Sequence, residues 1–223
     1  MDALSECLDV NVVGTKNLLE ASTGAGVCRF IYSASSTCYG NSPTPHRLDT
    51  RIDLLNPYGW SKYAGEQLAL MFALNNPIDV VSLRYFNVYG PREPVSGPYA
   101  LVLGIFVGNW LAGRSLEIHG TGHQSRDFVH VSDVVSCNIR AAESSVSGRA
   151  FNVGTGRAVS VLELAGLISD DLAYAPPRKG DSKSTLADIS ETTEHLGWTP
   201  AVEIHTGVAE AVALAASSTN QIR

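Results

Sequence analysis

Apolar residues recur at helical spacing near the start of the chain and then gather in short strand-like runs. The spacing predicts an amphipathic helix over residues 4–21, one face of which consists of Leu4, Leu8, Asn11, Thr15 and Leu18. Two apolar runs, at 27–33 and 78–83, predict buried strands. Between them Asn56-Pro57 predicts a helix start, and this helix runs to about residue 75. The order of elements favours a parallel α/β fold with right-handed crossovers.

The pattern changes after Pro91 to shorter elements separated by glycines. Helices are predicted at 101–111, 132–143, 161–168 and 203–215, and strands at 116–118, 126–131 and 149–153. The change in composition at residues 90–98 is therefore the predicted domain boundary. The sequence contains no internal repeat and no low-complexity tract.

The composition is that of a globular protein, and it limits the partners of the chain. Of the 223 residues 44% are hydrophobic, and 16 Lys and Arg against 22 Asp and Glu leave a net charge of −6 without a basic run. This balance disfavours binding to nucleic acid or to an anionic membrane. The most apolar stretch, residues 99–110, is interrupted by glycines and is shorter than the ~20 residues of a membrane span.

The cysteines and the N-terminus predict a cytoplasmic protein. The four cysteines form no C-x-x-C pair, so they are expected to be reduced thiols. The first residues, M-D-A-L-S-E, resemble neither a signal peptide nor a transit peptide. His119 and His123 lie in a Gly-rich turn without cysteine or carboxylate ligands nearby, so no metal site is predicted.

The strongest chemical signal is the segment Y-G-W-S-K, which places Tyr58 and Lys62 one turn apart on the same helix face. A phenol becomes a base near pH 7 only where positive charge favours the phenolate. One ammonium at ~6 Å supplies about 2.8 kcal/mol at an effective dielectric of about 20, less than the roughly 4 kcal/mol required. A second positive charge is needed, and an oxidised nicotinamide ring would provide it. A Tyr and a Lys at this spacing also occur by chance on helix surfaces.

Two neighbouring features support a site near Tyr58. The segment 33–37 supplies hydroxyl groups directly after a predicted strand, at the carboxyl end where α/β proteins form their sites. These hydroxyls could share a proton with Tyr58 and hold a substrate oxygen, although Ser-rich turns are also frequent. Asn11 interrupts the apolar face of the first helix, so it is expected to be buried and hydrogen-bonded. It either supports the site or merely satisfies backbone groups.

Six segments appear in the order found in one protein family. They are I-Y-S-A-S-S-T-C-Y-G (31–40), N-P-Y-G-W-S-K (56–62), L-R-Y-F-N-V-Y-G-P-R (83–92), S-R-D-F-V-H-V-S-D-V (125–134), F-N-V-G-T-G (151–156) and R-K-G-D-S-K-S-T-L-A-D-I-S (178–190). Over nearly the whole chain they resemble the NAD-dependent epimerase/dehydratase family, the extended short-chain dehydrogenases. Within it they are most similar to the UDP-hexose and UDP-N-acetylhexosamine 4-epimerases.

The resemblance implies an NAD-dependent isomerase that acts on a UDP-sugar. In this family a hydride passes from C4 of the sugar to NAD and returns to the opposite face of a 4-keto intermediate. At the matching positions Tyr58 is the acid/base, Lys62 holds the cofactor ribose, and Ser35 shares the proton at the sugar 4-hydroxyl. The implied cofactor contacts are Tyr58, Lys62, Tyr85, Ser33 and Asn11. The implied substrate contacts are Ser35, Ser36, Thr37, Asn87, His119, Arg126, Arg178, Asp181 and Thr185.

Two positions separate subclasses of the family. The sugar-nucleotide 4,6-dehydratases carry Asp-Glu directly after the catalytic hydroxyl residue, and the UDP-glucuronate decarboxylases keep a Glu there. This chain has Ser36 and Thr37 instead, which favours epimerisation over elimination. At Thr185, family members with a bulky residue exclude N-acetylated sugars, so a Thr suggests room for an N-acetyl group.

The first strands of the family and its Gly-rich cofactor turn have no counterpart in this sequence. Gly154-Thr155-Gly156 is rejected as a cofactor loop, because Val159 stands where a dinucleotide fingerprint has its third glycine. The resemblance implies an incomplete Rossmann-type doubly wound sheet in residues 1–90, whose strand at 27–33 has lost a neighbour. Residues 91–223 are mainly a smaller α/β substrate domain, with 131–155 returning toward the Rossmann sheet.

Three interpretations follow from these motifs. The chain is a 4-epimerase whose N-terminal third lies outside it, or a catalytically inactive or partner-dependent remnant of one. The third interpretation is another sugar-nucleotide short-chain dehydrogenase, a dehydratase or a decarboxylase. If the chain folds, the resemblance implies a homodimer formed through the helices at 3–21 and 57–75.

Overall fold

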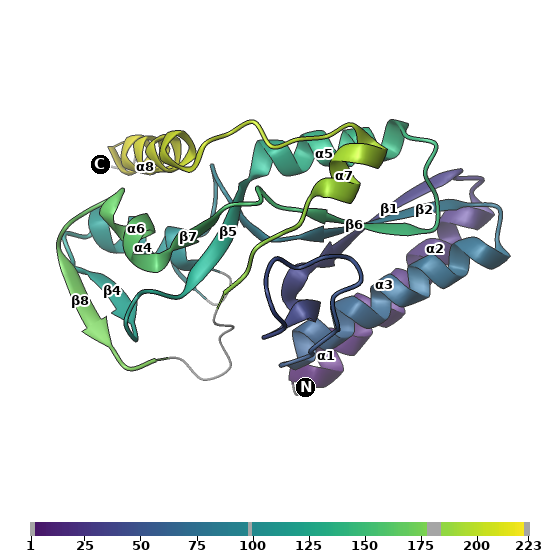
Figure 1. Cartoon of the computed structure of the whole chain (residues 1–223), viewed down its shortest axis with the longest axis horizontal. Helices are drawn as coiled ribbons and strands as arrows, with labels where there is room; N and C mark the ends of the chain where they lie inside the picture. The colour runs from purple at the N-terminus through teal and green to yellow at the C-terminus, as the bar shows by residue number, and fades with distance from the viewer. Residues whose placement is uncertain (1–2, 98–99, 178–183, 221–223) are drawn as a thin grey trace.

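The molecule consists of a sheet region and a second region of short strands, which lie side by side (Figure 1). The computed structural model describes residues 3–97, 100–177 and 184–220. The sheet region contains three parallel strands in the order β1-β2-β6, which are β1 (Arg29–Ser35), β2 (Asp79–Tyr85) and β6 (Arg149–Val153). The strands predicted at these places are confirmed.

Helices cover both faces of this sheet (Figure 1). One face carries α2 (Thr15–Gly24) and α3 (Pro57–Asn75), and the other carries α5 (Val131–Glu143) and α7 (Ser190–Leu196). The strands alternate accordingly. The α3 side buries Tyr32, Ala34 and Val80, while the α5 side buries Val81, Leu83, Phe151 and Val153. Burial on both faces is typical of a parallel sheet.

The N-terminal helical segment contains a π-helix between two α-helical parts. α1 (Ala3–Leu8), the π-helix η1 (Asp9–Gly14) and α2 follow one another without a break, which confirms the helix predicted over 4–21. The carbonyl of Asn11 accepts a hydrogen bond from the Thr15 hydroxyl at 2.8 Å. The same carbonyl lies against Gly65 of α3, where a Cβ would overlap it, so a glycine is required there. The apolar spacing does not predict this π-helix.

Strand β1 lies at an edge of the sheet. Within the described ranges it pairs with β2 alone. The backbone groups along its other side therefore have no strand partner in this part of the chain.

The second region is built from short strands and three helices. β3 (Asn87–Tyr89), β5 (Ser125–His130) and β7 (Ala158–Ser160) form one sheet, and β4 (Leu116–His119) and β8 (Leu172–Ala175) form a parallel pair. They enclose a core with α4 (Val102–Leu111), α6 (Val161–Gly166) and α8 (Ile204–Asn220). This core buries Leu103, Phe106, Leu116, Ile118, Leu164 and Val208.

The sequence pattern does not predict five elements of the two regions: β3, β7, β8, η2 and α7. The strands β3, β7 and β8 have only three or four residues, too few to show a period, and the 3₁₀ turn η2 (Ser36–Tyr39) is equally short. The helix α7 has a polar sequence and is held by its tertiary contacts, since Thr192 Oγ1 donates to the Asn152 carbonyl at 2.6 Å. The strand predicted at 126–131 ends one residue early, at His130, because the His130 side chain caps α5.

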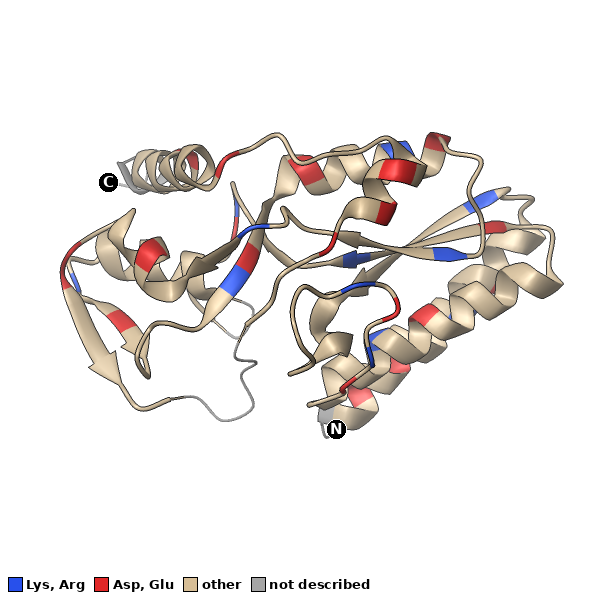
Figure 2. Ribbon diagram, in the orientation of Figure 1, with Lys and Arg blue, Asp and Glu red and all other residues tan. Residues whose placement is uncertain are grey.

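Charged residues are dispersed along both regions, with Lys and Arg interspersed among Asp and Glu (Figure 2). No helix in the described part of the chain is both long and apolar enough to cross a membrane.

Candidate active site

A cavity of about 410 Å³ opens at the carboxyl ends of β1 and β2, where the two regions meet. The register explains its position, because Ser35 and Tyr85 are paired at the ends of their parallel strands. The backbone then continues into η2 on one side and β3 on the other. Eight of the residues predicted for the site line this cavity: Ser35, Ser36, Thr37, Tyr58, Tyr85, Asn87, Arg126 and Thr185.

The hydroxyl of Ser35 is oriented by the turn that follows it. It accepts hydrogen bonds from the backbone N–H of Thr37 at 3.3 Å and from the Thr37 hydroxyl at 2.9 Å. A serine hydroxyl has one proton and two lone pairs, so two acceptances leave its proton to be donated elsewhere. Ser35 therefore presents a donor to the cavity that it lines.

The first turn of α3 carries Tyr58 into the same cavity. The side chain of Asn56 caps the helix by accepting from Gly59 N–H at 2.8 Å, as its position before a proline predicts. The Tyr58 side chain is 48% exposed, which leaves its phenol accessible to a ligand in the cavity. Tyr58 and the hydroxyls of Ser35 and Thr37 thus come from separate segments to one place.

Lys62 lies one turn further along α3 and outside the cavity lining. Its ammonium stands over the Tyr32 ring, 4.6 Å from the ring centroid, a cation–π contact. No carboxylate of the described residues is within ion-pair distance of it. Burial lowers the pKa of Lys62 below its ordinary value, and the charge of Glu66 opposes this effect. The charge is therefore held near the site without an internal ion pair.

Side-chain hydrogen bonds hold this turn of α3 in place. The side-chain amide of Asn11 donates to the Ser61 hydroxyl at 3.0 Å, and that hydroxyl donates to the Tyr58 carbonyl at 3.0 Å. The Tyr32 hydroxyl donates to the Lys62 carbonyl at 3.1 Å. Asn11 is hydrogen-bonded, as expected, but it is half-buried rather than buried, and it contacts the helix that carries Tyr58 without lining the cavity.

A second chain of hydrogen bonds runs behind Tyr85. Asn138 of α5 donates its amide to the Val134 carbonyl at 2.7 Å, which turns its Oδ1 toward Tyr85, and the Tyr85 hydroxyl donates to that oxygen at 2.9 Å. Ser33 Oγ lies 3.2 Å from the same phenol oxygen. Because the single proton of Tyr85 is used on Asn138, Ser33 is the donor in this pair, and its lone pairs remain free to accept.

The far end of the cavity is formed by the second region. Thr185 Oγ1 donates to Asn87 Oδ1 at 3.3 Å and accepts from Asp127 N–H at 3.2 Å. Arg126 is the charged residue among the described residues that line the cavity. A guanidinium beside amide and hydroxyl groups suits a ligand with an anionic, multi-oxygen group such as a diphosphate.

One predicted substrate contact among the described residues, His119, does not line this cavity. His119 lies at the end of β4, where its Nδ1 is 3.0 Å from the Pro176 carbonyl oxygen. Arg178 and Asp181 lie outside the described residues.

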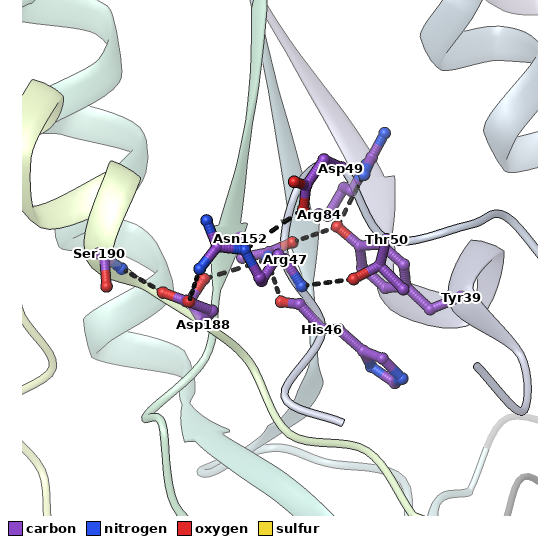
Figure 3. A network of polar contacts seen from close by, with 9 residues as sticks. All are labelled: Tyr39, His46, Arg47, Asp49, Thr50, Arg84, Asn152, Asp188 and Ser190. Carbon is purple, nitrogen blue, oxygen red and sulfur yellow. Dashed lines mark hydrogen bonds and ion pairs between the residues drawn. The ribbon is translucent and has the colours of Figure 1, made fainter. Parts of the chain in front are cut away.

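Behind the cavity, a buried ion pair joins α3 to β2. Arg84 Nε and Nη2 donate to the two carboxylate oxygens of Glu66 at 2.9 and 2.6 Å. Arg84 Nη1 donates to the Tyr39 hydroxyl at 2.7 Å, and Tyr39 donates to Asn152 Oδ1 at 2.8 Å (Figure 3). Burial raises the pKa of Tyr39 to about 12, so the phenol keeps the proton that it donates. Desolvation alone would lower the pKa of Arg84, but the hydrogen bonds and charge of Glu66 raise it above its ordinary value.

Sequence reasoning misses the buried pair and also Tyr39 and Asn138. The sequence carries no clear signal for the pair, because Glu66 stands between Gly65 and Gln67 and Arg84 follows the strand predicted at 78–83. Charged residues are buried almost exclusively when paired, and the partner becomes evident only in the folded chain. Nothing in the sequence pattern singles out Asn138 or Tyr39.

The loop at 154–156 binds an internal carboxylate through its backbone. Asp127 accepts hydrogen bonds from the backbone N–H groups of Thr155 at 2.7 Å, Gly156 at 3.0 Å and Ala187 at 3.0 Å. The donors that a cofactor phosphate would need are therefore already used, which supports the rejection of this segment as a cofactor loop.

Lys62→Met should raise the midpoint of thermal unfolding at pH 7, because the buried ammonium is more favourable in the unfolded chain. The folded pKa of Lys62 is lowered, so between it and the ordinary value of about 10.4 the unfolded chain binds more protons. Wild-type stability therefore rises with pH through that window, and the gap to the variant should close there. Thermal melts followed by circular dichroism from pH 7 to above pH 10 measure this.

Lys16→Met is the matched control for this substitution. Lys16 is exposed on α2 and is paired with Glu20 at 2.8 Å. Its removal should leave the midpoint nearly unchanged, since such pairs contribute about 0.3–0.5 kcal/mol. A lower midpoint for Lys62→Met would contradict the prediction and would show that the contact with Tyr32 outweighs the desolvation of the ammonium.

Comparison with known proteins agrees with this geometry. A model of the NAD-dependent epimerase/dehydratase family matches residues 1–154. UDP-glucose 4-epimerase of Mycolicibacterium smegmatis is 38% identical over 211 residues, which cover 91% of this chain and 67% of that protein. The chain thus spans about two thirds of the length of this curated relative.

Solved structures give the same result. UDP-glucose 4-epimerase from Thermotoga maritima, crystallised with UDP-glucose, has a TM-score of 0.92 at 33% identity, covering 99% of this chain and 73% of that one. UDP-glucuronic acid 4-epimerase from Bacillus cereus, in complex with UDP-glucuronic acid and NAD, has a TM-score of 0.85 at 28% identity, covering 96% and 68%. The resemblance carried by the sequence motifs is confirmed, and the chain belongs to the NAD-dependent epimerase/dehydratase family.

Proposed function

We propose that the chain is the catalytic and substrate-binding part of a nucleotide-sugar 4-epimerase that acts on a UDP-hexose or UDP-N-acetylhexosamine. The observation that carries this proposal is the meeting of Tyr58 and Ser35 with Asn87 and Arg126 in a single cavity. One end of the cavity has hydroxyl groups for proton transfer, and the other has a cation and polar groups for a diphosphate. The similarity to UDP-sugar 4-epimerases supports the same assignment.

In this proposal the side chains of Tyr58 and Ser35 act on the sugar 4-hydroxyl. Tyr58 as phenolate accepts the hydroxyl proton when C4 is oxidised and returns it when C4 is reduced. Ser35 has an uncommitted proton, so it can donate to the same oxygen and keep it in place. Arg126 and Asn87 bind the diphosphate at the other end of the cavity. This anchors the nucleotide and leaves the sugar beside Tyr58 and Ser35.

The residues on the β1 side fit the nicotinamide half of NAD. Lys62 offers an ammonium without an internal ion pair in the described residues, which suits ribose hydroxyls. Ser33 is exposed and retains free lone pairs, and Tyr85 lines the cavity next to it. When bound, NAD would supply a reversible acceptor for the hydride at C4, and its positive ring would further favour the Tyr58 phenolate.

A dehydratase or decarboxylase is the less favoured alternative. Elimination needs its own acid and base, and the positions after Ser35 carry Ser36, which is buried, and Thr37, whose hydroxyl is bonded to Ser35. No carboxylate of the described residues lines the cavity. An inactive or partner-dependent remnant is the other alternative, and it is tested by the activity of the chain itself.

Tyr58→Phe should lower kcat by about 10²–10⁴-fold, because it removes the group that moves the proton. The assay supplies the purified chain with NAD and either UDP-glucose or UDP-N-acetylglucosamine and measures the 4-epimer formed. The affinity for UDP, measured by calorimetry, should stay within twofold, since Tyr58 lies at the sugar end of the cavity. Tyr174→Phe, an exposed tyrosine on β8, is the control that should change neither quantity.

The wild-type result separates the alternatives. UDP binding without epimerisation, and without nicotinamide released on denaturation, would support the inactive remnant. A dehydrated or decarboxylated product in place of the 4-epimer would favour the third interpretation.

Thr185→Tyr should reduce kcat/KM at least tenfold more for UDP-N-acetylglucosamine than for UDP-glucose. Thr185 lines the cavity and contacts Asn87, so a larger side chain there occupies the space proposed for an N-acetyl group. Thr185→Ser is the control that keeps the hydroxyl and should preserve the ratio. An equal loss for both substrates would refute the assignment of Thr185 to sugar selection.

The division into domains is also a proposal. Residues 1–90 and the returning segment 131–155 are assigned to the cofactor domain because β6 pairs with β2. The rest of 91–223 is assigned mainly to the substrate domain. A cytoplasmic location is proposed from the cysteine pattern, and the four cysteines are free thiols.

A homodimer is proposed through the outer surface of the N-terminal helices and α3. Exposed apolar side chains on these helices are Leu4, Val10, Val13, Leu18, Trp60, Met71 and Leu74. Apolar side chains in this number on adjacent helices indicate a covered surface.

Size-exclusion chromatography with light scattering should give twice the chain mass at micromolar concentration. Leu18→Lys combined with Leu74→Lys should give the monomer mass, because two charges would be placed in the apolar contact. Tyr174→Lys, on a different surface, should leave the mass unchanged. A monomeric wild-type chain would refute the proposed interface.

A further inference from the structure

The buried pair of Glu66 and Arg84 is the most constrained polar contact near the cavity. Glu66 is 1% exposed and Arg84 is 5% exposed. The guanidinium edge that faces Glu66, formed by Nε and Nη2, donates to both carboxylate oxygens. Ser82 Oγ donates a further hydrogen bond to Glu66 at 3.1 Å. Two residues of β2 thus bind the carboxylate, and their hydrogen bonds fix its orientation.

The partners of this pair belong to the two segments that carry the proposed catalytic groups. Glu66 is on α3, one turn beyond Lys62 and on the helix that begins with Tyr58. Tyr39, the second hydrogen-bond partner of Arg84, is the last residue of η2, the turn that directly follows Ser35. A single guanidinium on β2 therefore contacts both segments at once.

Stability does not account for such a pair. Replacing a buried ion pair by apolar residues of similar volume is often neutral or stabilising, because two desolvated charges barely recover their cost. The apolar surroundings for such a replacement exist here, since Ala34, Ala69 and Val80 are buried on the α3 face of the sheet. Apolar residues could not replace the directional contacts of the pair. Five hydrogen bonds fix the position of α3 and η2 relative to β2, whereas dispersion contacts are non-directional.

We propose that Glu66 and Arg84 are positioning residues that set the separation between the Tyr58 phenol and the Ser35 hydroxyl. Arg84 holds α3 through Glu66 and holds η2 through Tyr39, so the two segments keep one relative position. Misplacement of about 1 Å can cost a factor of about 10² in rate, so a loosened pair should lower kcat while binding is preserved. The inference rests on the proposed 4-epimerase function.

The test is the double substitution Arg84→Met with Glu66→Leu in the full chain. It removes both charges together, so no unpaired charge is left in the interior. We expect the far-UV circular dichroism and the thermal midpoint to remain close to wild type, kcat to fall at least tenfold, and the affinity for UDP to stay within twofold. A kcat within twofold of wild type in the folded double variant would overturn the proposal.

Arg149→Met with Glu191→Leu is the matched control. This pair joins the neighbouring strand β6 to α7 at 2.8 Å, is exposed, and touches neither η2 nor α3. Its removal should change kcat by less than twofold. A tenfold loss in this control would show that turnover responds to any disturbance of the sheet, and that result would also overturn the proposal.

Tyr39→Phe keeps the inference testable if the double variant does not fold. It removes one hydroxyl, and with it the hydrogen bond from Arg84 to η2, while the charged pair and the contact of the guanidinium with the ring stay in place. We expect a threefold or greater loss of kcat with unchanged UDP affinity. Wild-type kcat in this variant would overturn the proposal.

Crystal structures of the wild type and the double variant provide a readout that is independent of turnover. A changed distance between Tyr58 Oη and Ser35 Oγ is expected, and an unchanged distance would refute the positioning role. If the wild-type chain shows no epimerase activity, the proposed function fails, and this distance alone decides whether the pair positions the two groups.

Discussion

The parallel pairing of β1 with β2 is the constraint on which the site depends. Parallel strands end at the same edge of a sheet, so the pairing of Ser35 with Tyr85 brings the segment after each strand to one place. η2 then returns the hydroxyl groups toward α3, and β3 leads Asn87 into the second region. A slip of one residue in this register would turn Ser35 to the opposite face and empty the cavity of its donor.

The helix α3 contributes to this geometry by its placement more than by its sequence. Its N-cap determines where Tyr58 begins the first turn, and the π-helix at Asn11 lets the N-terminal helices approach it closely. The ion pair of Glu66 with Arg84 then joins α3 to β2. Each contact restricts a different degree of freedom of one helix, so the cap, the contact with Asn11 and the buried pair together determine where α3 lies.

Sequence patterns predict the long elements here and miss most of those with three or four residues, for a physical reason. α3 and β2 have enough residues for a cap, a period and an apolar run to act together, whereas β7 and β8 have three or four residues and owe their form to their partners. The same distinction holds for the site. Tyr58 and Lys62 are recognisable at helical spacing, but Tyr39 and Asn138 have no local pattern and act only because the fold places them beside Arg84 and Tyr85.

By itself, the sequence determined the α/β class, the helix start at Asn56, the face shared by Tyr58 and Lys62, and the family motifs. These depend on local propensity and on residues close together in the chain, which a single sequence shows directly. Only the tertiary structure decided that Arg126 and Thr185 meet Ser35 in one cavity and that His119 does not. Such membership depends on strand register and on contacts between distant segments, where packing and hydrogen-bond geometry select one arrangement among many that the local sequence allows.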